Sequence, residues 1–351
     1  DILDLGVLAF TGAFPLPGDH VPHGPLAICI GQGSGLVQLK HDYSPSLFYT
    51  VSYGYRSGLN LSMVKHLERK AANLSRFIDG ATASILDIGS NDGTLLNAYK
   101  YCLDFSSKSI CRVGVDPTIS AFQQFYDSDI ITHSRFFDDI LVSRLGDSAF
   151  DLITSVSMFY DLPDPLGFVS NISRVLKKTG VWHFEQSYLL SMLRASSFDT
   201  ICHEHTEYYS VSVINNLLAL NGLKIIDLSF NDVNGGSVAI TAAHSCSDLP
   251  ESYMLKWVLE VENSLGIHDP SAKIYADFIG NVYNTISSLN SLFDSIAQTG
   301  ATIYGLGAST KGNTLLQMPG FNHGLIRGIF EVNESKYGHV TPGSSVPIMP
   351  E

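Results

Sequence analysis

The sequence predicts an α/β fold in which a doubly wound parallel sheet is flanked by a small β-rich lobe and a second strand-and-helix domain. Between residues 62 and 246, short apolar runs that end in polar residues alternate with helical patterns. The preceding residues are rich in glycine and proline and show little helical periodicity. After residue 246, two helical stretches lead to another strand, glycine turn and helix start. We therefore expect domains at residues 1–61, 62–246 and 247–351.

The amino-terminal lobe contains a predicted hairpin. Apolar runs at residues 25–30 and 36–39 are separated by the glycine-rich turn 31–35, and strand, glycine turn, strand is a hairpin signal. The aromatic- and glycine-rich segment 49–58 follows. Two interpretations of this segment stay open: aromatic packing between lobes, or a loop that closes over a ligand.

A helix is predicted from residue 62, with Ser62 as its N-cap and Gly80 as its stop. Arg69 and Arg76 fall largely on faces other than the apolar one. The apolar positions at helical spacing are Met63, Leu67, Ala71, Leu74 and Ile78.

Predicted strands and helices then alternate along the chain. In a doubly wound sheet, ligands bind beyond the carboxyl ends of the strands, so the residues that follow each strand are the candidates for a site. The predicted strands are residues 85–88, 113–116, 151–156 and 181–185, with a helical stretch such as 165–176 between two of them.

The first of these strands runs into a turn that suits a polar ligand. Gly89 and Gly93 allow the backbone to bend and to approach a ligand closely. Asp87 and Asp92 place two carboxylates around the turn, which would repel a pyrophosphate but suit a cation. The spacing also lacks the G-x-G-x-x-G dinucleotide pattern. Asp116, at the end of the next strand, can bind a pair of ribose hydroxyls. The alternative is a generic βαβ unit.

The most titratable cluster in the chain is His203, Glu204 and His205. H-x-H can ligate zinc, but no third ligand at suitable spacing is evident, and the H-E-x-x-H pattern is absent. A histidine beside a glutamate is well matched to proton abstraction near neutral pH. The alternative is a pair of ordinary histidines that cap a helix start. A nucleophilic role for Cys202 is the weaker hypothesis.

Composition and net charge argue against several classes of protein. The net charge of −13 argues against a general nucleic-acid binder, which needs clustered lysine and arginine. The five cysteines form no C-x-x-C pair, which is typical of a reducing compartment. No apolar stretch has transmembrane length and no signal peptide is visible. We expect a cytoplasmic protein with no membrane or nucleic-acid partner. The sequence does not predict an oligomeric state.

A second glycine turn lies near the carboxyl end, at residues 305–313. Gly305 and Gly307 with Lys311 would suit a phosphate or a carboxylate, although the spacing is not that of a P-loop.

Together these segments resemble the NDP-sugar C-methyltransferases of deoxysugar biosynthesis. The Asp87–Gly89–Gly93 pattern is similar to the first motif of class I S-adenosylmethionine (SAM) methyltransferases. The family combines a small zinc-binding lobe, a class I SAM domain and a Rossmann-like carboxyl-terminal domain that helps to hold the nucleotide sugar. The matching segments are residues 3–6, 35–39, 55–58, 87–96, 114–117, 198–201, 203–205, 235–237, 305–308, 311–313 and 341–343.

The resemblance implies SAM-dependent methyl transfer to carbon 3 of a nucleotide-linked 4-keto-6-deoxysugar. His205, paired with Glu204, would be the base, and Tyr53 or Tyr55 falls near the sugar. The implied SAM-binding residues are Asp87, Gly89, Ser90, Asn91, Asp92, Gly93, Asp116, Pro117, Phe137 and Ser157. The implied substrate-binding residues are Tyr55, Arg56, Asp161, Glu185, Tyr188, Cys202, His203, Asn234, Gly235, Lys311 and Asn313.

The chain departs from the family pattern around the sugar and the zinc. Ser34, and Gly31 or Cys29, stand where the family has zinc cysteines, so we expect no metal ligands and no zinc. Cys202 replaces a tyrosine, Asp161 a histidine, and Asn234 the histidine of an H-G-G motif. Two alternatives follow: an O-methyltransferase on a related sugar, or a silent protein that binds SAM or a nucleotide sugar. The family also leads us to expect the carboxyl-terminal domain to continue past residue 351.

Overall fold

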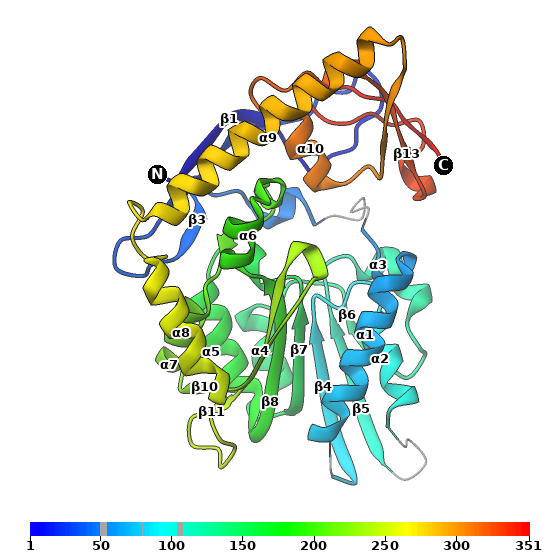
Figure 1. Cartoon of the computed structure of the whole chain (residues 1–351). Helices are drawn as coiled ribbons and strands as arrows, with labels where there is room; N and C mark the ends of the chain where they lie inside the picture. The colour runs from blue at the N-terminus through cyan, green and yellow to red at the C-terminus, as the bar shows by residue number, and fades with distance from the viewer. Residues whose placement is uncertain (50–54, 79, 104–107) are drawn as a thin grey trace. The chain divides into compact units, whose positions relative to one another are not determined.

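The computed structural model describes residues 1–49, 55–78, 80–103 and 108–351 (Figure 1). The chain forms two compact units, which are described separately. The sheet unit comprises residues 49–187 and 211–260, and the terminal unit comprises residues 1–48, 188–210 and 261–351. The domain boundaries predicted from the sequence stay predictions, because one compact unit can contain more than one domain.

Within the described residues, the sheet unit contains a seven-stranded sheet in the order β10-β11-β8-β7-β4-β5-β6. The strands from β6 to β8 are parallel, and β11 is antiparallel to both of its neighbours. Helices cover both faces (Figure 1). This arrangement confirms the predicted doubly wound α/β fold. The strands are β4 (Thr82–Ile88), β5 (Ser109–Val115), β6 (Ile131–His133), β7 (Phe150–Val156), β8 (Leu176–Ser187), β10 (Leu223–Asn231) and β11 (Ser237–His244).

The direction of winding reverses between β4 and β7, which places the ligand crevice beyond the carboxyl ends of these strands. α1 contacts α2, while α5 contacts both α4 and α7. The helices are α1 (Leu61–Leu74), α2 (Thr94–Ala98), α3 (Ile119–Phe122), α4 (Asp139–Leu145), α5 (Pro165–Val175), α7 (Val211–Leu220) and α8 (Tyr253–Leu265), the last of which ends in the terminal unit.

The bounds of α1 differ from the predicted ones. The N-cap is Asn60, whose side chain accepts a hydrogen bond from the Ser62 amide (3.0 Å), so the prediction of Ser62 as the cap is wrong. The helix ends at Leu74 and passes into a 3₁₀ turn before Gly80. An asparagine immediately before the helix satisfies the first free amide, which moves the start forward. The predicted apolar stripe is confirmed, since Leu67, Ala71 and Leu74 are buried.

The terminal unit contains an antiparallel sheet, β1-β2-β3-β9, and a parallel sheet, β12-β13-β14. The predicted hairpin is confirmed as β2 and β3. The strands are β1 (Leu3–Ala9), β2 (His23–Ile30), β3 (Val37–Leu39), β9 (Glu207–Tyr208), β12 (Ile303–Leu306), β13 (Ile326–Glu331) and β14 (Ile348–Pro350). The helices are α6 (Leu189–Ala195), α9 (Lys273–Gln298) and α10 (Thr310–Leu316).

One hydrophobic core joins the two ends of the chain in this unit. Leu26 and Ile28 of the hairpin share a buried cluster with Phe278 and Val282 of α9. A lobe of about 50 residues rarely buries enough apolar surface to be stable alone. The amino-terminal lobe therefore obtains its core from the carboxyl-terminal region. Among the described residues, no helix has the length and apolar character needed to cross a membrane.

Candidate active site

The glycine turn after β4 is held in a tightly packed, left-handed conformation. Gly89 and Gly93 have φ angles of 73° and 76°. A Cβ on Gly89 would lie 2.8 Å from Met158 Cγ, and one on Gly93 would lie 2.7 Å from the Tyr126 ring. Both contacts are too close for a side chain, and the φ angles favour glycine. Asn91, between them, is left-handed as well, with φ 49°.

Asp87 is the buried acid at the end of β4. Thr154 donates a hydrogen bond to its Oδ1 (2.6 Å). Burial raises the pKa of Asp87 to about 7, the Thr154 hydrogen bond opposes this shift, and nearby Asp116 adds to it. A cationic ligand stabilises the ionised form of a carboxylate, and this stabilisation matters most where burial disfavours ionisation. Asp87 is therefore suited to a positively charged group such as the ammonium of SAM.

Asp116 ties the end of β5 to the glycine turn. Its Oδ2 accepts a hydrogen bond from the Asn91 amide (3.0 Å), and its Oδ1 accepts from the Thr118 amide (2.7 Å) and hydroxyl. Burial raises the pKa of Asp116, and these hydrogen bonds oppose that shift. Pro117 follows directly. The two acids expected to hold SAM are thus parts of one hydrogen-bonded framework.

Tyr126 supports this turn and was missed in the sequence. Its hydroxyl contacts Ser90 Oγ (2.8 Å) and donates to the Asn91 carbonyl (2.8 Å). Burial raises the Tyr126 pKa, so the group stays a neutral phenol. No pattern around residue 126 indicates this role.

Asn91 and Asp92 bind the segment before α1. Asn91 Oδ1 accepts from the Ser57 amide (2.9 Å), and its Nδ2 donates to the Tyr55 carbonyl (3.1 Å). Asp92 Oδ2 accepts from the Gly58 amide (2.9 Å). These contacts attach residues 55–58 to the glycine turn at residues 89–93 (the donor turn). The two interpretations of segment 49–58 stay predictions.

Arg56 lies beside the donor turn, with its Nε 4.0 Å from Asp92 Oδ2, whereas Tyr49 contacts a residue after β7. The Arg56 guanidinium lies 4.0 Å from the centre of the Phe125 ring. Tyr49 donates a hydrogen bond to Asp161 Oδ2 (2.7 Å). Tyr53 lies outside the described residues, so its predicted role stays a prediction.

Polar residues after β7, at the end of β8 and before β11 meet at one edge of the sheet. The Ser157 amide donates to the Glu185 carbonyl (2.7 Å), and Asn234 Nδ2 donates to Ser157 Oγ (3.1 Å). Asn234 and Gly235 are left-handed, with φ angles of 56° and 88°. Phe137 packs against Phe168 of α5, with the ring centres 5.4 Å apart.

Glu185 is fully buried and heavily hydrogen-bonded. His66 contacts Oε1 (2.7 Å), while Lys70 (2.6 Å) and Asn231 (2.7 Å) contact Oε2. Burial raises its pKa, but the His66 and Lys70 interactions outweigh burial and bring the pKa to about 2. The carboxylate is thus ionised and its oxygens are engaged inside the sheet unit.

The His203–Glu204–His205 segment lies in the terminal unit, in a loop between a 3₁₀ turn at Phe198–Thr200 and β9. No helix starts there, so the alternative of two helix-capping histidines is wrong. The two histidines have different environments. His203 is fully buried and packs against Phe10 and Tyr43, at ring distances of 4.9 and 5.2 Å. His205 is half-buried.

His205 is held as a neutral base. Its Nδ1 lies 2.8 Å from the Thr200 carbonyl oxygen, which can only accept, so Nδ1 carries the proton and Nε2 has a lone pair. Burial lowers the His205 pKa to about 4, the Thr200 hydrogen bond opposes this shift, and the Lys311 charge adds to it. The imidazole is therefore unprotonated at neutral pH.

Glu204 is buried against the amino-terminal segment. Thr11 donates to its Oε2 (3.2 Å), and a Cβ on Gly12 would overlap its Oε1. Burial raises the Glu204 pKa. Asn313 donates to the Thr11 carbonyl (2.7 Å) and so holds this segment in place. Thr11 and Gly12 were missed in the sequence, where nothing marks a contact across 190 residues.

The remaining predicted substrate residues of this unit are buried or half-buried. Cys202 is buried, and Lys311 is half-buried with a pKa lowered by burial. Tyr188 donates to Glu262 Oε1 (2.8 Å), and both side chains are buried.

The residues present do not fit the zinc site of the family that the chain resembles. Zinc needs four ligands, mostly thiolates or imidazoles. The hairpin has Cys29 but Gly31 and Ser34 at the neighbouring positions, and no group of three His, Cys, Asp or Glu residues in the described part of the chain could hold a metal.

Comparison with known proteins identifies the family. Residues 63–228 match the family described as "Methyltransferase domain", and residues 232–351 match "C-methyltransferase C-terminal domain". C-methyltransferase NovU from Streptomyces niveus is 28% identical over 359 residues, which cover 99% of this chain and 82% of that protein. These matches indicate that the protein is a SAM-dependent C-methyltransferase.

Solved methyltransferases overlap with about half of this C-methyltransferase. A putative methyltransferase in complex with Trm112 from Haloferax volcanii has a TM-score of 0.41 and 16% identity, covering 52% of this chain and 94% of its own. Magnesium protoporphyrin IX methyltransferase from Synechocystis PCC 6803, with bound SAM, has a TM-score of 0.38 and 12% identity, covering 52% of this chain and 79% of its own.

Proposed function

We propose that this C-methyltransferase methylates carbon 3 of a nucleotide-linked 4-keto-6-deoxysugar and uses His205 as its base. The sugar, the carbon and the base are carried over from the resemblance of segments along the whole chain to the NDP-sugar C-methyltransferases. We also propose that the enzyme works in the cytoplasm, in keeping with a sequence whose five cysteines form no C-x-x-C pair.

SAM, when bound, supplies a methyl group on a sulfonium centre that a carbon nucleophile can attack. Asp87 would hold the cationic methionine end, and Asp116 would hold the ribose hydroxyls. Gly89 and Gly93 allow the left-handed turn that packs against Met158 and Tyr126 and would bring the donor close to the backbone. These residues orient the donor and take no part in proton transfer.

The state of His205 is the observation that carries the proposal. A base acting next to a ketone must be neutral and must present a lone pair. The Thr200 carbonyl fixes the proton on Nδ1, and burial keeps the imidazole neutral at pH 7. The nearby Lys311 charge would favour the negative charge that develops on the enolate oxygen.

The proposed reaction is balanced without a further reactant. His205 Nε2 takes the proton from carbon 3, and the C–H electron pair becomes the enolate. The enolate carbon forms a bond to the methyl carbon, and the electrons of the C–S bond leave with S-adenosylhomocysteine. His205 then gives its proton to solvent.

The test is methyl transfer from labelled SAM to a dTDP-4-keto-6-deoxysugar, with the product analysed by mass spectrometry. His205→Ala should lower kcat by at least about 100-fold and leave SAM affinity unchanged, because the base does not contribute to donor binding. His41→Asn changes an exposed histidine and is the matched control.

Full activity of His205→Ala would contradict the base assignment. A methyl group on oxygen, with the carbon 3 proton retained, would favour the O-methyltransferase alternative. Tight binding of both ligands without transfer would favour a silent binding protein.

A further inference from the structure

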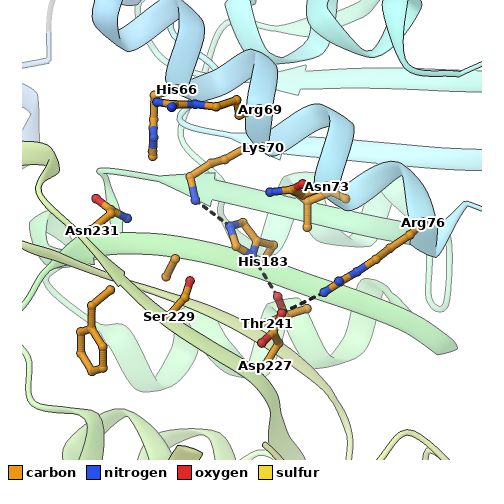
Figure 2. A pocket seen from close by; sticks show the side chains of 13 residues that line it. His66, Arg69, Lys70, Asn73, Arg76, His183, Asp227, Ser229, Asn231 and Thr241 are labelled. Atoms are coloured by element: carbon orange, nitrogen blue, oxygen red, sulfur yellow. Dashed lines mark hydrogen bonds and ion pairs between the residues drawn. The ribbon is translucent and has the colours of Figure 1, made fainter.

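A cavity of about 350 Å³, lined by both polar and apolar side chains, lies in the sheet unit between the α1 region and the strands β8, β10 and β11. Figure 2 shows Lys70, on α1, reaching toward His183, and Arg76, in the 3₁₀ turn that follows α1, reaching toward Asp227. The donor turn follows β4, and β7 separates β4 from the strands that line this cavity. The cavity is therefore distinct from the SAM-binding turn.

Polar side chains lie on both walls of the cavity, beside the apolar Leu74, Phe230 and Ala239. His66, Arg69, Lys70 and Asn73 follow one another along α1 at spacings of three, one and three residues, and Arg76 lies in the 3₁₀ turn (Ser75–Phe77) that follows the helix. The facing strand β10 alternates so that Asp227, Ser229 and Asn231 point to the same face. Polar side chains from the α1 region and from β10 therefore line the same cavity.

The carboxylates of the cavity are already engaged by partners in the same unit. Asp227 accepts from Arg76 (2.8 Å) and from the Leu228 amide (3.0 Å). Glu185, below the cavity, accepts from His66 through Oε1 and from Lys70 and Asn231 through Oε2. Neither carboxylate is thus suited to bind a cationic ligand.

His183 is a neutral part of the wall. Its Nε2 lies 3.0 Å from the Lys70 ammonium, which can only donate, so Nε2 accepts and Nδ1 donates to Thr241 Oγ1 (3.0 Å). Burial and the Lys70 charge lower the His183 pKa, which agrees with this tautomer. The Thr241 hydroxyl, having accepted this bond, keeps its own hydrogen to donate.

The unused hydrogen-bonding capacity of the cavity includes the donors of Arg69 and Asn73. In the part of the chain that the structure describes, the Arg69 and Asn73 side chains make no hydrogen bond or ion pair, and both residues are exposed. Three cations, Arg69, Lys70 and Arg76, line the cavity. Lys70 is paired with Glu185 and Arg76 with Asp227, so among the described residues the charge of Arg69 has no carboxylate partner. This local excess of positive charge occurs in a chain whose net charge is −13.

We propose that this cavity is an anion site that binds the phosphate group of a small molecule, through Arg69, Arg76 and Asn73. Arginine binds phosphate with two parallel hydrogen bonds, and several donors around one cavity match the oxygens of a phosphate better than a single carboxylate. The volume allows a small organic group beyond the phosphate. The phosphate could come from the free ion or from a phosphate monoester. This inference does not depend on the sugar substrate or on His205.

The experiment is calorimetric titration of the full chain with inorganic phosphate, glycerol phosphate and acetate, at an ionic strength held constant with chloride. Phosphate and glycerol phosphate should bind saturably, below about 10 mM, and acetate should not. Tighter binding of glycerol phosphate than of phosphate would identify a monoester as the ligand, and equal or weaker binding would identify the free ion. Saturating SAM should leave the affinity unchanged, because the donor turn is elsewhere on the sheet.

Arg69→Gln is the decisive variant, because Arg69 is exposed and its loss leaves no unpaired partner in the described structure. It should weaken phosphate binding about tenfold or more, as expected for one charge-assisted contact. Lys65→Gln removes a cation from an exposed position of the same helix outside the cavity, and should bind phosphate as the unchanged enzyme does. No saturable binding, or equal loss in both variants, would overturn the proposal.

Discussion

The donor turn and the His205–Glu204 cluster are constructed in opposite ways. The donor turn is local: Asp87, Gly89 and Gly93 lie within seven residues, and Asp116 joins them through the Asn91 amide. The His205–Glu204 cluster is assembled from distant segments, because Glu204 is held by Thr11 and packed against Gly12. The donor site therefore depends on one turn, whereas the proposed base site depends on the fold of the terminal unit.

Among the variants that test this comparison, Gly12→Ala should have the largest effect on the rate. The added Cβ would overlap Glu204 Oε1 and displace the carboxylate. A displacement of about 1 Å in a catalytic arrangement can cost on the order of 100-fold in rate. We therefore expect kcat to fall by about 100-fold with SAM affinity unchanged, as measured by steady-state kinetics and calorimetry.

The control is Gly280→Ala on α9, where an added Cβ would meet nothing within 4 Å. Thermal unfolding of both variants separates a local displacement from a loss of the fold. A Gly12→Ala enzyme that folds and keeps its full rate would show that the position of Glu204 is unimportant.

Asp87→Asn should change the donor turn alone. The Asp87 pKa is raised to about 7 in the free enzyme, and a cationic donor favours its ionised form. Donor binding must therefore remove a proton below pH 7, so SAM affinity should fall by up to about tenfold per pH unit as the pH decreases below 7. The variant should bind SAM about tenfold more weakly at pH 8.

This pH dependence is measured by calorimetry in buffers of different ionisation enthalpy. The unchanged enzyme should release protons on SAM binding at pH 7, and Asp87→Asn should release fewer. Equal proton release from both proteins would show that Asp87 does not respond to the donor charge.

Asn91→Ala should have the smallest effect. It should loosen residues 55–58, which are hydrogen-bonded to the donor turn. It removes the bonds to the Ser57 amide and to the Tyr55 carbonyl but keeps the bond from the Gly58 amide to Asp92. We expect hydrogen exchange at the Ser57 amide to become about tenfold faster, with the Gly58 amide as the internal reference. Unchanged exchange at Ser57 would show that other contacts hold residues 55–58.

The same contrast explains how much the sequence could predict. The doubly wound sheet and the donor turn follow from periodicity and from glycines and acids close together in the chain. Thr11 and Gly12 could not be found, because their contact with Glu204 spans more than 190 residues and leaves no local pattern. Tyr126, which supports the donor turn, also lies outside any motif.

α1 shows the limit of a periodicity argument. Its apolar stripe was predicted correctly, and Arg69 and Arg76 were placed on other faces. That assignment did not reveal that one polar side of the helix faces a polar strand surface across a cavity. The residues of β8, β10 and β11 that complete this cavity lie more than 100 residues further along the chain.

The most direct test of the account is proton exchange without methyl transfer. The enzyme is incubated in D₂O with the 4-keto sugar nucleotide and S-adenosylhomocysteine, and deuterium at carbon 3 is followed by NMR. If His205 is the base, the unchanged enzyme will exchange this proton and His205→Ala will not, although both bind S-adenosylhomocysteine. Equal exchange by the two proteins would contradict the central claim.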